Sequence, residues 1–187
     1  AFEGQAVAFA DAPVARTRQA AIDGTLSIMV GATAETFARI APLLRHMASE
    51  VTHCGDAGAG QTVKILNNMI LFQTVVALGE ALSIARAHGV DGKVLYETLT
   101  KGSADSFALR NHGMKAMLPG VFPERAFSTE YALKDLGYAI EMAGEKGVPA
   151  LGADVARELM ERAVELGHGK EYWPVLLRAI EDATGNG

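Results

Sequence analysis

Short apolar runs alternate with polar turns in the first part of the chain. Each run is bounded by turn-forming residues, which is typical of short buried strands, and the three runs are 6–10, 26–30 and 51–54. Apolar residues at helical spacing over 33–47, with Thr33 as the N-cap, predict a helix between the second and third strands. This part of the sequence therefore predicts a small α/β layer.

From Gly58 onward, helical patterns fill almost the whole chain. The longest pattern, 61–88, is apolar on nearly every face, as in a helix at the centre of a bundle. Further helices are predicted over 91–101, capped by Asp91, over 128–145, opened by Ser128, and over 149–166 and 173–183. We expect a mainly α protein, with an all-α domain over 58–187 and the α/β layer over 1–57. Three short strands and one helix bury little, so we also expect further strands upstream or from another chain.

Charge and hydropathy narrow the choice of partners. The chain has 17 Lys and Arg against 22 Asp and Glu, without a basic cluster, which argues against nucleic acid binding. The apolar stretch 63–85 is interrupted by polar residues, so we interpret it as a buried helix and expect no membrane span. The single cysteine, Cys54, and the lack of a signal-like start favour a cytoplasmic protein. The five histidines show no metal-ligand spacing, so we expect no metal site.

A glycine pair precedes the longest helix. Gly58-Ala59-Gly60 resembles the start of a dinucleotide fingerprint, but Val63 takes the place of the third glycine and a long helix follows where a second strand is required. We therefore interpret the pair as a tight turn from strand to helix.

Lys64 and Asn68 lie four residues apart on one face of that apolar helix. A buried ammonium group without a partner is costly, so Lys64 either extends to the surface beside a hydrogen-bonded core asparagine or lines a cleft. The residues alone leave both alternatives open.

Three segments together resemble the β-hydroxyacid dehydrogenases. Residues 58–68 resemble the signature G-x-G-x-x-x-K-x-x-x-N, and Asp11-Ala12-Pro13-Val14 with Gly24-Thr25-Leu26 is similar to the substrate-binding segment. Residues 127–136 are similar to the segment F-x-x-x-L-x-x-K-D-L. The family includes 3-hydroxyisobutyrate dehydrogenases, in which a Rossmann domain is joined through a long helix to an all-α domain.

The resemblance implies a domain plan. Residues 1–57 would be the C-terminal remnant of a dinucleotide-binding Rossmann domain, and 58–187 the substrate-binding, catalytic and dimerisation domain. The cofactor would be NAD or NADP, and the protein a homodimer or homotetramer. Because most of the Rossmann domain would precede residue 1, we expect little activity from the 187 residues alone.

The resemblance also implies site residues. Lys64 would be the catalytic acid/base, and Asn68 would orient it or bind the substrate. Partial desolvation suits this role because it lowers the pKa of a lysine toward neutrality. Lys134, Asp135 and Phe127 would contact the cofactor or shape its site, although an ordinary solvated ion pair and a core aromatic are the alternatives for these residues.

The clearest departure from the family lies at Ala15-Arg16-Thr17, where most members have Ser-Gly-Gly. With Asn68, we assign these residues to substrate binding. Arg16 offers donors that match a carboxylate or sulfonate, so we expect a small anionic hydroxy acid or semialdehyde. A family branch with Arg-Thr here reduces aldehydes with a strongly acidic head group such as a sulfonate. Arg16 as a plain surface residue, and the whole chain as an inactive helical dimerisation module, remain the alternatives.

Overall fold

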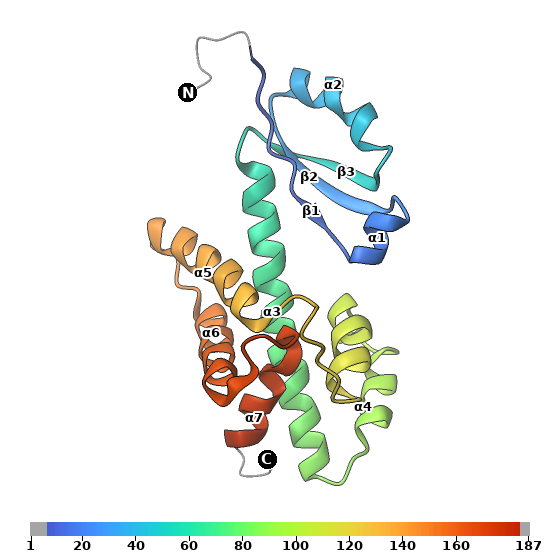
Figure 1. Ribbon diagram of the computed structural model, residues 1–187, viewed down its shortest axis with the longest axis vertical. Helices are drawn as coiled ribbons and strands as arrows, with labels where there is room; N and C mark the ends of the chain where they lie inside the picture. The colour runs from blue at the N-terminus through green and yellow to red at the C-terminus, as the bar shows by residue number, and fades with distance from the viewer. Residues whose placement is uncertain (1–6, 184–187) are drawn as a thin grey trace. The chain divides into compact units, whose positions relative to one another are not determined.

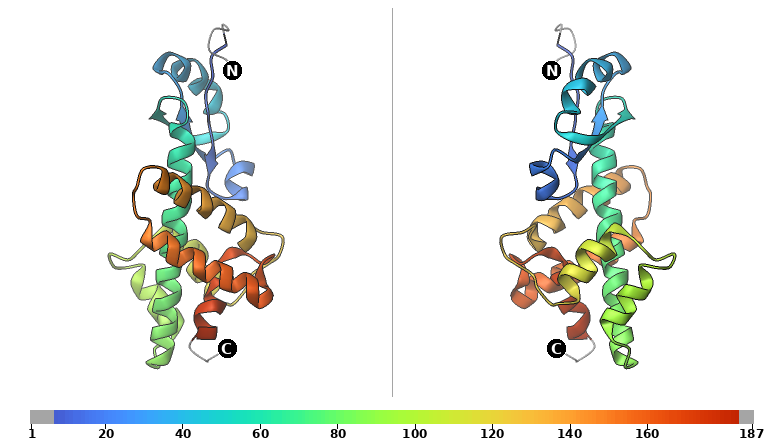
Figure 2. Two further views of the ribbon diagram at one scale, coloured as in Figure 1. Left: turned by 90° about the vertical axis from the view of Figure 1, so that its left-hand side faces the viewer. Right: turned by 90° about the vertical axis from the view of Figure 1, so that its right-hand side faces the viewer.

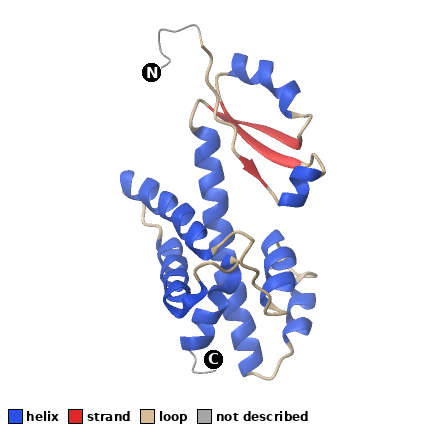
Figure 3. Ribbon diagram, in the orientation of Figure 1, coloured by secondary structure: helices blue, strands red, loops and turns tan. Residues whose placement is uncertain are grey.

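The computed structural model describes residues 7–183 and divides the chain into two compact units (Figure 1). The division falls between Asn67 and Asn68, inside the longest helix, α3 (Ala59–Ala87). Helices dominate the chain and one small sheet accompanies them (Figure 3). The prediction of a mainly α protein with a long helix is confirmed.

The N-terminal unit contains a three-stranded sheet in the order β1 (Val14–Ala15), β2 (Leu26–Gly31), β3 (Ala48–Gly55). Strand β1 runs antiparallel to β2, whereas β2 and β3 are parallel. Helix α2 (Ala34–Leu44) makes the crossover that a parallel pair requires. Phe37, Ile40 and Leu44 of α2 pack against the buried strand residues Ile28 and Val30.

Local capping explains where α2 begins. The hydroxyl of Thr33 accepts a hydrogen bond from the backbone N–H of Thr36 at 3.2 Å, which confirms the predicted N-cap. The five-residue helix α1 (Arg18–Ile22), which the sequence pattern did not predict, is capped in the same way by Thr17. A helix of this length is too short to display a periodicity.

The prediction of a strand over 6–10 is wrong for the residues that the structure describes. Residues 7–10 are not in a strand, and Ala6 lies outside the described part of the chain. The backbone instead first joins the sheet at Asp11, which forms an isolated antiparallel bridge with Gly31. An apolar run indicates burial, but only a hydrogen-bonding neighbour makes it a strand.

Asp11 also fixes the start of α3. One carboxylate oxygen accepts a hydrogen bond from the backbone N–H of Gly58 at 2.5 Å, and the other accepts from that of Gln61 at 2.7 Å. The first N–H groups of a helix have no partner within the helix and carry a partial positive charge. A carboxylate from a distant part of the chain therefore caps this helix.

Glycines allow the carboxylate to approach. A Cβ at Gly60 would lie 2.7 Å from Asp11 Oδ2, and one at Gly31 would lie 2.8 Å from the carbonyl oxygen of Asp56. Gly58 adopts a φ of 96°, which lies in the region that favours glycine. These features confirm the predicted tight turn from strand to helix.

The C-terminal unit is a helical bundle. Its elements beyond α3 are α4 (Gly92–Leu99), the π-helix η1 (Leu109–Met117), α5 (Thr129–Glu145), α6 (Leu151–Ala163), the π-helix η2 (Val164–His168), the 3₁₀-helix η3 (Trp173–Leu176) and α7 (Leu177–Ala183). Helices α5 and α6 lie side by side in both views of Figure 2, and α6 also contacts α7. Phe72 and Leu82 of α3 and Trp173 of η3 are fully buried in the common core.

Most of the predicted helices of this unit are confirmed. Asp91 caps α4 and Ser128 caps α5, as expected. The predicted helix 149–166 begins at Leu151 and widens into η2, and the segment predicted over 173–183 is split into η3 and α7. The π-helix η1 was not predicted.

Helix α3 is long and apolar enough to cross a membrane by length and composition alone, in contrast to the expectation from its polar interruptions. The core helix of a soluble protein meets the same criterion, and 44% of the most apolar window of α3 is buried within the chain. Length and composition are therefore weak evidence for a span.

Burial gives His112 of η1 an unusual titration. The residue is 7% exposed, and its Nδ1 lies 2.6 Å from the hydroxyl of Tyr172. Its buried Nε2 has no hydrogen-bond partner among the described residues. Burial, with a smaller effect of Lys115, lowers the pKa of His112 to about 4. Folding therefore keeps this imidazole neutral.

Removal of the Asp11 cap is expected to destabilise the N-terminal unit. The Asp11→Ala variant loses both acceptors at the start of α3, so its free energy of unfolding should fall by about 1–2 kcal/mol. Asp11→Asn keeps one acceptor and should lose less. Urea denaturation measures both, with Asp23→Ala as the exposed control, and equal stability of Asp11→Ala and the parent chain would contradict the capping role.

Acid should destabilise the fold through His112. The unfolded chain binds a proton at this residue near pH 6.5, whereas the folded chain does so near pH 4, so the free energy of unfolding should fall over this interval and no further below it. The contribution is up to about 3 kcal/mol. In urea denaturation at pH 7 and pH 4.5, His112→Asn should show a smaller pH dependence than the parent. An unchanged pH dependence would rule out this contribution.

Candidate functional site

Asn68 is held in place within the C-terminal unit. Its side chain is buried, with 6% exposed, and its Nδ2 donates a hydrogen bond to Asp135 Oδ2 of α5 at 3.0 Å. A buried amide needs such a partner, because leaving the group unpaired costs about 1–3 kcal/mol. The hydrogen bond therefore fixes the orientation of this amide.

Lys64 lies four residues before Asn68 on α3, which is about one helical turn. It is partly buried, whereas Val63 beside it is 40% exposed. The sequence predicted a lysine and an asparagine on one face of an apolar helix, and both residues lie on the same continuous helix.

Asp135 joins the buried amide to a surface cation. Its Oδ1 lies 3.2 Å from Lys134 Nζ, while its Oδ2 accepts from Asn68. The hydrogen bond from Lys134 to Asp135 is the main cause of a raised pKa of Lys134, so this ammonium group stays charged at neutral pH. Asn68, Asp135 and Lys134 thus form a connected polar network. The sequence alone also allowed Lys134 and Asp135 to be an ordinary solvated ion pair.

Lys134 also contacts two aromatic rings that the sequence analysis did not single out. Its Nζ lies 4.1 Å from the ring centroid of Tyr131 and 5.5 Å from that of Tyr138. The spacing of these tyrosines, three residues before and four residues after the lysine, could have identified them once a helix was predicted there.

Phe127 packs against the core. Its ring lies 6.2 Å from that of Phe72 and 6.0 Å from that of Tyr131, and its carbonyl accepts a hydrogen bond from the backbone N–H of Trp173. These contacts match the core-aromatic alternative, and the assignment of Phe127 to the cofactor site stays a prediction.

The segment Ala15-Arg16-Thr17 lies in the N-terminal unit. Ala15 pairs with Ser27 at the edge of the sheet. Arg16 has a φ of 84°, where glycine is favoured, which explains why a glycine in the family's pattern fits this position. The hydroxyl of Thr17 accepts a hydrogen bond from the backbone N–H of Ala20 as a helix cap.

The Arg16 side chain is exposed but ordered by its contacts. Its Nη1 donates to the carbonyl oxygen of Thr25 at 2.6 Å and to the hydroxyl of Ser49 at 2.7 Å. A guanidinium group has five N–H donors, so one edge can be anchored while another binds an anion. This arrangement is compatible with the predicted contact to an acidic substrate.

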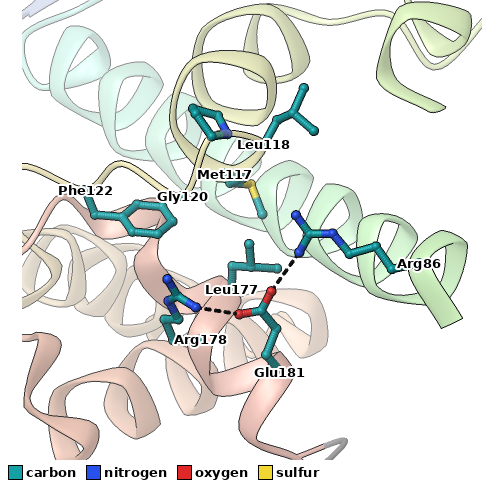
Figure 4. A pocket seen from close by; sticks show the side chains of 9 residues that line it. Arg86, Met117, Leu118, Gly120, Phe122, Leu177, Arg178 and Glu181 are labelled. Atoms are coloured by element: carbon teal, nitrogen blue, oxygen red, sulfur yellow. Dashed lines mark hydrogen bonds and ion pairs between the residues drawn. The ribbon is translucent and has the colours of Figure 1, made fainter. Parts of the chain in front are cut away.

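A metal cluster and a pocket are two other features that could mark a functional site. Among residues 7–183, no group of three or more His, Cys, Asp or Glu side chains could hold a metal ion. A small pocket of about 160 Å³ in the C-terminal unit contains none of the predicted site residues (Figure 4). There, Glu181 bridges Arg86 at 2.8 Å and Arg178 at 3.2 Å, which ties α7 to α3.

Several relatives match nearly the whole chain. The 2-(hydroxymethyl)glutarate dehydrogenase of Eubacterium barkeri is 34% identical over 95% of this chain and 58% of its own length. The 3-sulfolactaldehyde reductase of Escherichia coli is 30% identical over 94% of this chain and 58% of its own length. The chain thus spans less than two thirds of either relative.

A solved structure shows the same fold. The 3-hydroxyisobutyrate dehydrogenase of Salmonella typhimurium superposes with a TM-score of 0.82 at 28% identity, over 91% of this chain and 60% of that one. Residues 1–55 match the model of the NAD binding domain of 6-phosphogluconate dehydrogenase. Residues 58–179 match the model of the NAD-binding domain of NADP-dependent 3-hydroxyisobutyrate dehydrogenase. Because that second match covers more than half of the chain, the chain belongs to the β-hydroxyacid dehydrogenase family.

Proposed function

We propose that this chain forms the substrate-binding and catalytic part of an NAD(P)-dependent β-hydroxyacid dehydrogenase. The polar network of Asn68, Asp135 and Lys134 carries this proposal, together with Lys64, which lies one turn before Asn68 on α3. Residues 1–57 would belong to the dinucleotide-binding domain and 58–187 to the catalytic and dimerisation domain. The two family models, which meet between residues 55 and 58, support this boundary.

The residues of the C-terminal unit fit a nicotinamide cofactor. Lys134 is 45% exposed at its side chain and stays positively charged, so it suits the oxygen-rich groups of NAD or NADP. When bound, the cofactor accepts or supplies the hydride. Lys134 would hold it, Asp135 would keep the ammonium group in place, and Phe127 would support the start of α5.

Lys64 would move the proton. In the oxidation direction its neutral amine accepts the proton of the substrate hydroxyl, and in the reduction direction its ammonium form returns that proton to the carbonyl oxygen. The positive form also stabilises negative charge on that oxygen. Asn68, whose amide is oriented by Asp135, would position Lys64 or bind the substrate.

The substrate would be a small anionic hydroxy acid or its semialdehyde. Arg16 would bind its acidic group with the donors that do not contact Thr25 and Ser49, with Ala15 and Thr17 shaping the segment. Two relatives are named for substrates with acidic groups, a glutarate derivative and a sulfonated aldehyde, which supports this class.

An inactive helical assembly module is the second candidate. The C-terminal unit exposes large apolar side chains, among them Ile70 and Ile84 of α3, each 60% exposed, and Leu151 of α6, which is 72% exposed. Such surfaces commonly pair across a two-fold axis. This candidate requires neither Lys64 nor Lys134.

Replacement of Lys64 separates the two candidates. In the natural protein that carries this chain, Lys64→Ala should lower kcat by about 10²–10⁴-fold, because the proton-transfer group is lost. Steady-state kinetics with NAD(P) and small hydroxy acids measures the effect, and Lys146→Ala serves as the exposed control. Size-exclusion chromatography should show unchanged assembly, and unaltered turnover of Lys64→Ala would remove the catalytic assignment.

Replacement of Arg16 tests the substrate class. Arg16→Gly suits the φ of 84° and removes the guanidinium, so it should raise KM for a dicarboxylate or sulfonate substrate at least tenfold, with less than a threefold change in kcat. Arg18→Ala is the neighbouring control. An unchanged KM with intact stability would leave Arg16 as a surface residue.

A further inference from the structure

Two tyrosines flank Lys134 on the exposed face of α5. Tyr131 precedes the lysine by three residues and Tyr138 follows it by four, so all three side chains share one face of the helix. Tyr131 is 59% exposed and Tyr138 is 46% exposed, and Lys134 Nζ lies within 6 Å of both ring centroids. This distance is the range over which a cation is attracted to the face of an aromatic ring.

Asp135 supplies a third contact. Its carboxylate binds Lys134 through one oxygen and the buried amide of Asn68 through the other. A lysine side chain on a helix surface normally samples many rotamers, and ordering one costs free energy when a ligand binds. Here two ring faces and an anchored carboxylate contact the ammonium group.

We propose that Tyr131 and Tyr138 are positioning residues that hold Lys134 ready for the nicotinamide coenzyme. This inference rests on the proposed function, in which Lys134 contacts NAD or NADP. The motif F-x-x-x-L-x-x-K-D-L has a leucine where this chain has Tyr131, and a leucine offers no π face to the cation. The rings would therefore add an ordering contact that the motif itself does not encode.

The ring face, and not the hydroxyl, carries this role. A phenylalanine at both positions retains the attraction for the cation, whereas a leucine, which is apolar but smaller and has no π face, removes it. The double variant Tyr131→Leu, Tyr138→Leu should therefore raise the Kd of the coenzyme by about two- to tenfold, which is the range expected when one long side chain must be ordered on binding. The double variant with Phe should stay within twofold of the parent.

Coenzyme affinity is the first measurement. Titration of the natural protein that carries this chain with NADPH and with NADH, followed by cofactor fluorescence, gives Kd for the parent and for both double variants. Phe107→Leu, which replaces an exposed aromatic residue outside α5 by leucine, is the matched control and should leave Kd unchanged. Circular dichroism confirms that each variant is folded.

A spectroscopic measurement tests the geometry without activity. Reductive ¹³C-methylation of the lysines places a label on Lys134, and Lys134→Arg identifies its resonance. Two adjacent rings should shift this resonance upfield in the parent and in the Phe variant, and the shift should be lost in the Leu variant. A Lys134 resonance at the position of a solvent-exposed lysine in the parent would overturn the proposal.

Lys134→Ala distinguishes a failure of the tyrosine role from a failure of the proposed cofactor contact. If this change weakens coenzyme binding but the Leu variant binds as the parent does, the positioning role of the tyrosines is overturned and the proposed function stands. If Lys134→Ala leaves coenzyme binding unchanged, the cofactor role of Lys134 is itself wrong and the positioning role falls with it. Weaker coenzyme binding in Lys134→Ala and in the Leu double variant, with normal binding in the Phe double variant, supports the proposal.

Discussion

Two backbone N–H groups at the start of α3 donate to the carboxylate of Asp11, and the geometry of the N-terminal unit depends on these bonds. Asp11 itself is bound to Gly31 of β2 through both of its backbone groups. One residue thus links a strand of the sheet to the first turn of the long helix. The absence of side chains at Gly31 and Gly60 makes the link possible, because a Cβ at either place would overlap neighbouring atoms.

The position of Lys64 follows from this link. Lys64 lies three residues after Gln61, whose N–H contacts Asp11, so its place along α3 is set by the same capped turn. The glycine pair of the family signature has a structural task here, since it allows the helix to begin close to the strand. The signature therefore combines residues that place the helix with residues that we assign to chemistry.

Polar groups of the C-terminal unit are ordered from the core outward. The buried amide of Asn68 requires a partner, Asp135 provides it, and the second oxygen of Asp135 holds Lys134 at the surface. The buried His112 and the partly buried Tyr172 form a comparable pair, but there burial keeps the groups neutral. The first arrangement presents a fixed charge to solvent, whereas the second excludes charge from the core.

The sequence by itself determined the features that depend on residues close to one another along the chain. The caps at Thr33, Asp91 and Ser128 and the long apolar helix were predicted because their signals lie within one or two helical turns, and the motif around Lys64 identified the family. Only the tertiary structure decided which distant groups meet. Asp11 caps a helix 47 residues away and Asn68 binds a carboxylate 67 residues away, and no local pattern encodes such pairs. The strand expected over 6–10 failed for the same reason, because a strand requires a partner that hydropathy cannot supply.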